Sequence, residues 1–268
     1  MRASLPGASI TARRDPPHDA AGRLAFVGLL AITFAAATAA TAVHARAQAP
    51  YLLPLCGGAS LAMPVTGPAA ISFLTMWTVM MAAMMLPSLA PVLYGYRQAA
   101  SRAGGWHASL LAMLAGASYF GTWILAGAAA YLFEVARANL LAWQPALAVS
   151  APYATAVVLV VAGAFQCSAW KAGRLARCRR VEPAEQAPCA AAAWRLGGRL
   201  GWHCLCSCAG FTAVLLALGS MDPRVMSALA AAITVERLAP WGRRCARATG
   251  AALIIAGPAW LMAVAMNA

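Results

Sequence analysis

The sequence Met76-Trp77-Thr78-Val79-Met80-Met81-Ala82-Ala83-Met84-Met85 lies inside an apolar segment, 69–92, that contains no charged residue. A helix of about 20 apolar residues is long enough to span a membrane. Similar segments occur at 24–43, 108–133, 151–170, 203–220 and 248–266, with a shorter one at 225–239. These segments predict an all-α fold, a polytopic transmembrane helical bundle with about seven spans.

The composition supports this fold class. Hydrophobic residues make up 62% of the chain and charged residues 10%, whereas soluble domains carry about 25% charged residues. The net charge of +13 does not require a nucleic-acid partner, because orientation in the membrane and contact with anionic lipid explain it. No paired carboxylates, HExxH motif or phosphate-binding glycine loop is present, so we do not expect an enzyme.

The basic residues predict the topology. If the spans are placed as above, 17 Lys and Arg residues fall on one side and 3 on the other. Basic loops stay in the cytosol, so the N-terminus and loops 93–107, 171–202 and 237–247 are expected there. Without the short span 225–239, the basic cluster 237–247 would lie outside the cell, and this supports the short span.

The resulting division is a cytoplasmic tail, 1–23, and a single transmembrane domain, 24–268, with a basic cytoplasmic loop, 171–202. The expected location is the cytoplasmic (inner) membrane of a bacterium. The stretch 44–49 is similar to a signal-peptide cleavage site, although the apolar run before it is longer than an ordinary signal sequence. Cleavage there would leave the remaining topology unchanged.

Methionines and cysteines are concentrated in the spans. Met76, Met80 and Met84 fall within about 80° of one helix face, one turn apart, and Met81 and Met85 lie on a neighbouring face. Such a ladder of thioethers suits a soft metal ion, Cu(I) first. The alternative is that these methionines only fill gaps in the core.

His203-Cys204-Leu205-Cys206-Ser207-Cys208 opens a later span. Cys204 and Cys208 share a helix face, while Cys206 points about 200° away from Cys204. The predicted topology places this group near the cytosol, where thiols stay reduced, and within reach of Met84 and Met85. Cys204, Cys208 and His203 are therefore candidate ligands. The alternatives are cysteines that act as small hydrophobic residues and a histidine that anchors the interface.

The chain resembles a known family, the bacterial predicted metal-binding integral membrane proteins catalogued as domain of unknown function 2182. The resemblance covers roughly residues 70–250. It is carried by Met76-Trp77, Met80, Ala83-Met84-Met85, Pro87-Ser88, Gly163, Gln166, Lys171, Leu175, Cys178-Arg179, Gly201, Cys204, Cys208, Gly219, Met221, Met226 and Glu236. Some members are regarded as copper chaperones, which implies Cu(I) as the metal and a cuproenzyme client, with Cys178 as a further ligand.

This chain departs from the family pattern at two cysteines. Arg174 stands four residues before Cys178, where the family has a cysteine, and Ser207 stands in a position where another is expected. Cys206 is displaced by one position from Ser207, and Cys167 is additional. The site is therefore either retained with altered ligands or lost.

Three polar positions in or near the spans also carry predictions. Glu236 is expected at the cytosolic end of its span, where hydration and Arg237 can stabilise its charge. The alternative is a functional group or a residue with another charged partner. Gln166 lies within a span and needs a hydrogen-bond partner across helices. Glu134 is expected to pair with Arg137 at the outer boundary.

Three functions remain open at this point. The first is a Cu(I)-handling membrane protein with Met76, Met80, Met84, Met85, Cys178, His203, Cys204 and Cys208 as metal ligands. The second is a membrane assembly factor with structural cysteines. The third is a transporter of small molecules or of thiol redox equivalents. Substitution of Cys204 and Cys208 by serine distinguishes the first function from the second: if the first is right, the variant loses copper binding but keeps its fold.

Overall fold

The computed structural model of the protein describes residues 67–100, 105–179, 189–218, 223–239 and 241–267, together with isolated positions between 24 and 43. Every element in the described ranges is helical, which confirms the all-α prediction. The expected span 24–43 lies mostly outside the described residues. The elements are α2 (Gly67–Ala100), α3 (Gly105–Trp143), the 3-10 helix η3 (Pro145–Ser150), α4 (Ala151–Cys167), α5 (Ala169–Arg179), α6 (Ala190–Leu218), α7 (Pro223–Leu238) and α8 (Gly242–Asn267).

Five helices are long and apolar enough to cross a membrane: α2, α3, α4 together with η3, α6 and α8. The expected short span is present as α7, which has 16 residues and is shorter than the roughly 20 residues that a full crossing needs. A polytopic membrane protein follows from these helices.

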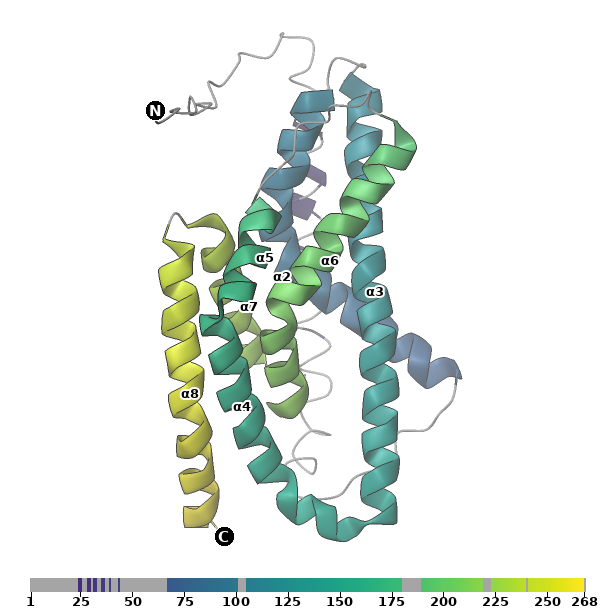
Figure 1. The fold of residues 1–268 in the computed structure, drawn as a ribbon. Coiled ribbons are helices and arrows are strands. Elements are labelled where there is room, and N and C mark those ends of the chain that lie inside the picture. The colour runs from purple at the N-terminus through teal and green to yellow at the C-terminus, as the bar shows by residue number, and fades with distance from the viewer. Residues whose placement is uncertain are drawn as a thin grey trace, which may run out of the picture.

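Figure 1 shows α5 continuing in the direction of α4, while the other successive helices run in alternating directions. The last turns of α2, α5 and α7 lie toward one end of the bundle, and η3 and the last turn of α8 lie at the other. The basic side chains that flank the connections after α5 and α7 therefore gather toward one end, including those of Arg195, Arg199, Arg243, Arg244 and Arg247. This agrees with the alternation that the distribution of Lys and Arg predicts.

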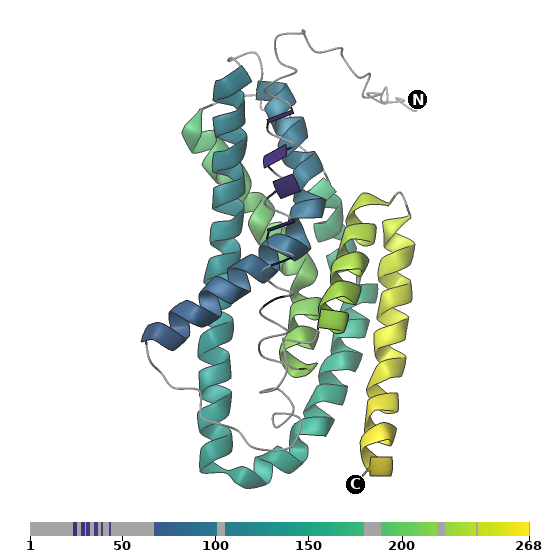
Figure 2. The same ribbon diagram turned by 180° about the vertical axis from the view of Figure 1, so that it is seen from behind.

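Contacts between helices define two groups, one of α4 and α8 and one of α2, α3 and α6. α4 packs most extensively against α8, and α3 packs against both α2 and α6. α6 also contacts α4 and α5, and α7 contacts α2 and α8, so α6 and α7 join the two groups. Figure 2 shows the first part of α2 slanting across α3 before the helix turns to run beside it. Pro87 and Pro91 lie inside α2 and account for a bend, because proline removes a helical hydrogen bond.

Helices occupy much of the expected cytoplasmic loop 171–202. Residues 169–179 form α5, and α6 begins at Ala190, well before the expected start of its span at 203. Alanine, leucine and arginine dominate both stretches, and these residues favour helix. Hydropathy indicates only the apolar part of a helix. The prediction therefore did not include the helical turns that carry arginine.

A single extended residue separates α4 from α5. Ser168 has φ −69° and ψ 147°, which ends α4. Its hydroxyl accepts a hydrogen bond from the Lys171 backbone N–H at 3.2 Å and so caps α5. The break directs Lys171 back toward Gln166, and the two side chains are hydrogen bonded.

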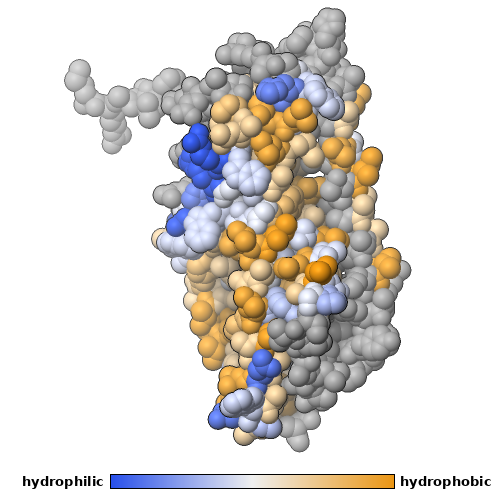
Figure 3. All heavy atoms as spheres, turned by 90° about the vertical axis from the view of Figure 1, so that its right-hand side faces the viewer, coloured by the Kyte–Doolittle hydropathy of each residue, from blue (hydrophilic) through white to orange (hydrophobic). Residues whose placement is uncertain are grey.

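Large apolar side chains on the outside of the bundle suit contact with lipid. Examples are Leu125 and Leu132 on α3, Val157 on α4 and Ile255 on α8, each more than half exposed. Figure 3 shows apolar surface over much of the face near α3, with the strongly hydrophilic patches toward its upper and lower ends. The Glu134 carboxylate lies 2.7 Å from Arg137 at the end of α3, which confirms the expected pair.

Glycines permit the close approach of α6 to α3. A Cβ on Gly197 would collide with the carbonyl oxygen of Ala115, and one on Gly201 would lie 2.6 Å from Thr122 Oγ1. At Gly198 the nearest atom would be Ser118 Oγ at 3.4 Å, an ordinary contact. The α3–α6 contact therefore depends on Gly197 and Gly201 but not on Gly198.

Substitution of these neighbouring glycines tests the contact. We expect Gly197→Ala to lower the free energy of unfolding in detergent by about 1–3 kcal/mol, because it overpacks the interface. Gly198→Ala is the matched control and is expected to be neutral or stabilising, since alanine favours helix. Thermal unfolding followed by circular dichroism measures both variants, and equal stabilities would contradict the packing described here.

Candidate functional site

Two cysteine thiols meet inside the bundle. Cys204 and Cys208 are one turn apart on α6, and both are buried, whereas Cys206 is only partly buried. This is the division that helix periodicity predicts. Trp77, Met80, Met84, Met85 and Tyr119 belong to the same hydrophobic cluster as the cysteine pair.

Three other helices contribute to the surroundings of Cys204. Tyr119 from α3 donates a hydrogen bond to Cys204 Sγ at 2.8 Å. Met85 Sδ from α2 lies 3.8 Å from the same sulfur. Arg237 Nη2 from α7 is the closest of these groups, at 2.6 Å. The thiol is therefore in contact with a phenol, a thioether and a guanidinium group.

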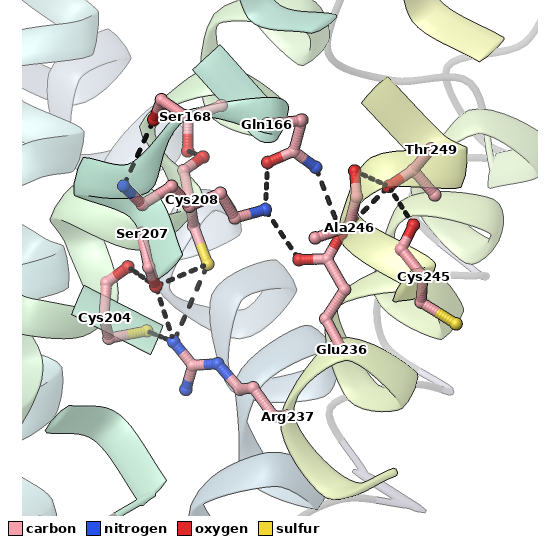
Figure 4. Close-up of polar contacts among 12 residues, drawn as sticks. Gln166, Ser168, Cys204, Ser207, Cys208, Glu236, Arg237, Cys245, Ala246 and Thr249 are labelled. Carbon is pink, nitrogen blue, oxygen red and sulfur yellow. Dashed lines mark hydrogen bonds and ion pairs between the residues drawn. The ribbon is translucent and has the colours of Figure 1, made fainter. Parts of the chain in front are cut away.

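The guanidinium group of Arg237 also reaches the second thiol. Its Nη2 lies 3.7 Å from Cys208 Sγ and 3.3 Å from Ser207 Oγ, and its Nη1 lies 3.3 Å from Ser88 Oγ. Figure 4 shows the group pointing toward the cysteines and Ser207. A cation in this place can balance the negative charge that the sulfurs carry when they bind a metal ion as thiolates.

A second polar group lies beside the thiols. Lys171 Nζ is 2.6 Å from Glu236 Oε2, and both side chains are nearly inaccessible to solvent. Gln166 Nε2 donates to Glu236 Oε1 at 3.2 Å, and the hydroxyl of Thr249 donates to the same oxygen at 3.0 Å. The expected cross-helix partner of Gln166 is thus confirmed.

The favoured expectation for Glu236 was wrong, and the alternative, another charged partner, is confirmed. Its carboxylate is not hydrated at the end of α7 but is buried against α5 and α8. Figure 4 shows Glu236 and Arg237, which are adjacent in the chain, directed to different neighbours. Lys171 belongs to α5, which is not one of the five spans. Burial lowers the pKa of Lys171, and the Glu236 carboxylate opposes this by raising it.

The structure brings only part of the predicted ligand set together. Met85 reaches Cys204, although it lies beside the ladder of Met76, Met80 and Met84 and not in it. Met80, Met81 and Met84 are buried in the same cluster, and Met76 is partly buried. No three His, Cys, Asp or Glu side chains within the described part of the chain form a metal-binding group. Among the described residues, a soft-metal site with a third ligand beyond the two cysteines would draw on a thioether.

His203, Cys178 and the two departures from the family pattern have different positions. His203 Nδ1 lies 3.1 Å from Arg174 Nη1, and the Arg174 guanidinium lies over the Trp170 ring. Ser207 is inside the cysteine group, where its hydroxyl donates to the Cys204 carbonyl at 2.9 Å. The side chain of Cys178 lies outside the described residues.

Two residues of this site were missed by the sequence interpretation. Arg237 was counted as part of a cytosolic basic cluster. Glu236 and Arg237, however, are two adjacent charged residues at the end of an apolar helix of only 16 residues, and such a position indicates that the charges are buried. Tyr119 was not singled out, although a phenol in an apolar helix needs a hydrogen-bond partner.

The buried ion pair makes a prediction about stability. Lys171→Met and Glu236→Leu are each expected to lower the free energy of unfolding by about 3–5 kcal/mol, because each leaves an unpaired buried charge. The double variant should lose less than either single variant. The exposed pair is the control, and Glu134→Gln should cost less than about 1 kcal/mol. Denaturation in detergent provides the comparison, and additive losses would show that the pair is not coupled.

Comparison with known proteins identifies the family. The model of a family described as PpoB2, copper chaperone, matches residues 74–260, which include the cysteine pair, Met85 and Arg237. No curated protein and no solved structure shows a significant match. Because the matched region covers most of the chain and all of the site, the protein belongs to the PpoB2 copper chaperone family.

Proposed function

We propose that this membrane protein binds Cu(I) through Cys204, Cys208 and Met85 and delivers it to a cuproprotein client. The observation that supports this best is the contact of the Cys204 sulfur with both Met85 Sδ, at 3.8 Å, and Arg237 Nη2, at 2.6 Å. Membership of a copper chaperone family supports copper as the cargo. The proposed location is the cytoplasmic membrane of a bacterium, since the arginine-rich connections suit its cytosolic side.

The donor set suits Cu(I) better than hard cations. Thiolate and thioether sulfurs select Cu(I), whereas Mg²⁺ and Ca²⁺ need several oxygen ligands. Cys204 and Cys208 are one helical turn apart, and Met85 approaches from α2. We propose that the two cysteines form the primary pair and that the thioether adds a weaker third bond.

The buried methionines give the ion a route of transfer. Met80, Met81 and Met84 occupy the same apolar cluster as Cys204 and Cys208, and Met76 lies one turn further toward the start of α2. Exchange between sulfur ligands would let Cu(I) move without being fully released to solvent. We therefore propose Met84, Met80 and Met76 as successive carriers away from the cysteine pair.

The altered ligands fit this proposal. In the resemblance to the predicted metal-binding membrane proteins, Arg174 and Ser207 replace expected cysteines. Ser207 donates to a backbone carbonyl and contacts Arg237, so it supports the site without a sulfur. Met85 would complete the set in its place. His203 and Cys178 stay predicted ligands for an earlier step at the cytosolic side.

Anaerobic Cu(I) titration against a competing chelator tests the cysteine pair. We expect the purified wild-type protein in detergent to bind one Cu(I) tightly, and Cys204→Ser/Cys208→Ser to lose this binding. Cys206→Ser is the matched control on the same helix and should bind as the wild type does, because Cys206 points away from the pair. Retention of tight binding by the double variant would overturn the assignment.

The thioether can be tested separately. Met85→Leu is expected to weaken Cu(I) binding at least about tenfold, the change that 1.4 kcal/mol produces, since leucine keeps the volume and removes the sulfur. Met113→Leu changes a methionine that is 40% exposed and should have no effect. The same titration, with X-ray absorption to count sulfur ligands, distinguishes a bound thioether from a packing role; an unchanged ligand count in Met85→Leu would argue for packing.

A further inference from the structure

A fixed positive charge is built into the proposed site. The guanidinium group of Arg237 lies 2.6 Å from Cys204 Sγ and 3.7 Å from Cys208 Sγ, and the Arg237 side chain is buried. Arginine stays protonated in proteins. Figure 4 shows that the group approaches the two sulfurs directly. Any metal ion that binds both sulfurs will therefore have a unit positive charge beside it.

The nearest charged groups that the structure describes form a balanced pair. Lys171 and Glu236 are 2.6 Å apart and form a pair of zero net charge. Three neutral hydroxyls lie beside these groups: that of Tyr119 donates to Cys204 Sγ, and those of Ser88 and Ser207 accept from Arg237. The two serine hydroxyls orient the guanidinium group without changing its charge.

From this arrangement we infer that Arg237 makes the site selective for monovalent over divalent soft metal ions. The inference rests on the proposed function, in which Cys204 and Cys208 bind as thiolates. Two thiolates and a monovalent ion carry one negative charge, which the guanidinium neutralises. Two thiolates and a divalent ion are neutral, so the guanidinium leaves one positive charge in the buried site.

The size of the effect follows from Coulomb's law. A unit charge about 4 Å from another, at an effective dielectric constant of about 20, changes a binding constant by up to about a thousandfold. The interior of this bundle excludes water from Cys204, which has no accessible surface, so screening by solvent is weak there. Selection by charge would add to the selection that sulfur ligands already exert against hard cations.

Competition between Ag(I) and Hg(II) isolates the charge. Both ions bind two thiolates, so the number and type of ligands are the same for each. The wild-type protein, Arg237→Met, Arg237→Lys and Arg243→Met are incubated with an equimolar mixture of the two ions, and the bound ratio is measured by mass spectrometry. Arg243 is exposed on α8 and controls for the loss of a charge elsewhere.

We expect Arg237→Met to shift the bound ratio toward Hg(II) by at least about tenfold, within the range that one buried charge allows. Arg237→Lys and Arg243→Met should stay close to the wild type. An unchanged ratio in Arg237→Met would overturn the inference. An equal shift in Arg237→Lys would also overturn it, because hydrogen-bond geometry and not charge would then decide the selectivity.

A second variant covers the case in which Arg237→Met does not fold. Ser88→Asp keeps the arginine and places a carboxylate beside its Nη1, which is 3.3 Å from Ser88 Oγ. It should shift the ratio in the same direction, and an unchanged ratio would count against the inference.

If the wild-type protein binds no Cu(I), the proposed function fails and the inference with it. If it binds Cu(I) through the cysteines and the ratio does not respond to Arg237, only the inference fails.

Discussion

The contact between the Arg237 guanidinium and the Cys204 sulfur determines much of the architecture around it. A charged side chain inside an apolar bundle needs a partner, and two such residues, Glu236 and Arg237, are adjacent on α7. They can both be satisfied only if α7 lies between α6 on one side and α5 and α8 on the other. Lys171 and Thr249 meet the carboxylate, and the cysteines and serines meet the guanidinium group. The short helix α7 is thus held by polar contacts on both sides.

Close packing of backbones complements these polar contacts. Gly197 and Gly201 bring α6 against α3, and this approach lets the Tyr119 hydroxyl reach Cys204 at 2.8 Å. On the opposite side of the bundle, Gly163 and Gly250 let α4 approach α8 in the same region as the Gln166 and Thr249 contacts. Small residues at helix interfaces are typical of membrane bundles. Here they position side chains that have to meet within a few ångströms.

The sequence predicted those features that depend on local periodicity. The spacing of four residues placed Cys204 and Cys208 on one face, and the order of the spans placed Met85 near them. It did not predict the burial of Lys171 and Glu236, because hydropathy assigns charged residues to loops and helix ends. The break at Ser168 and the depth of α7 in the bundle result from tertiary contacts. Met85, and not a methionine of the ladder, contacts Cys204 because of the rotation of α2 relative to α6. Sequence spacing alone does not determine that rotation.

The site has a consequence for biosynthesis. Its groups come from positions 85, 119, 204 and 237, so more than half of the chain separates the first of them from the last. A ribosome that has released α2 and α3 into the membrane has produced the thioether and the phenol but neither thiol. The thiols arrive with α6, and their cationic neighbour arrives only with α7. If these groups bind Cu(I) as proposed, the growing chain cannot hold the metal in its final arrangement, and loading has to follow completion of the bundle. Quality control of folding and control of metal uptake would then coincide in one late step of membrane insertion.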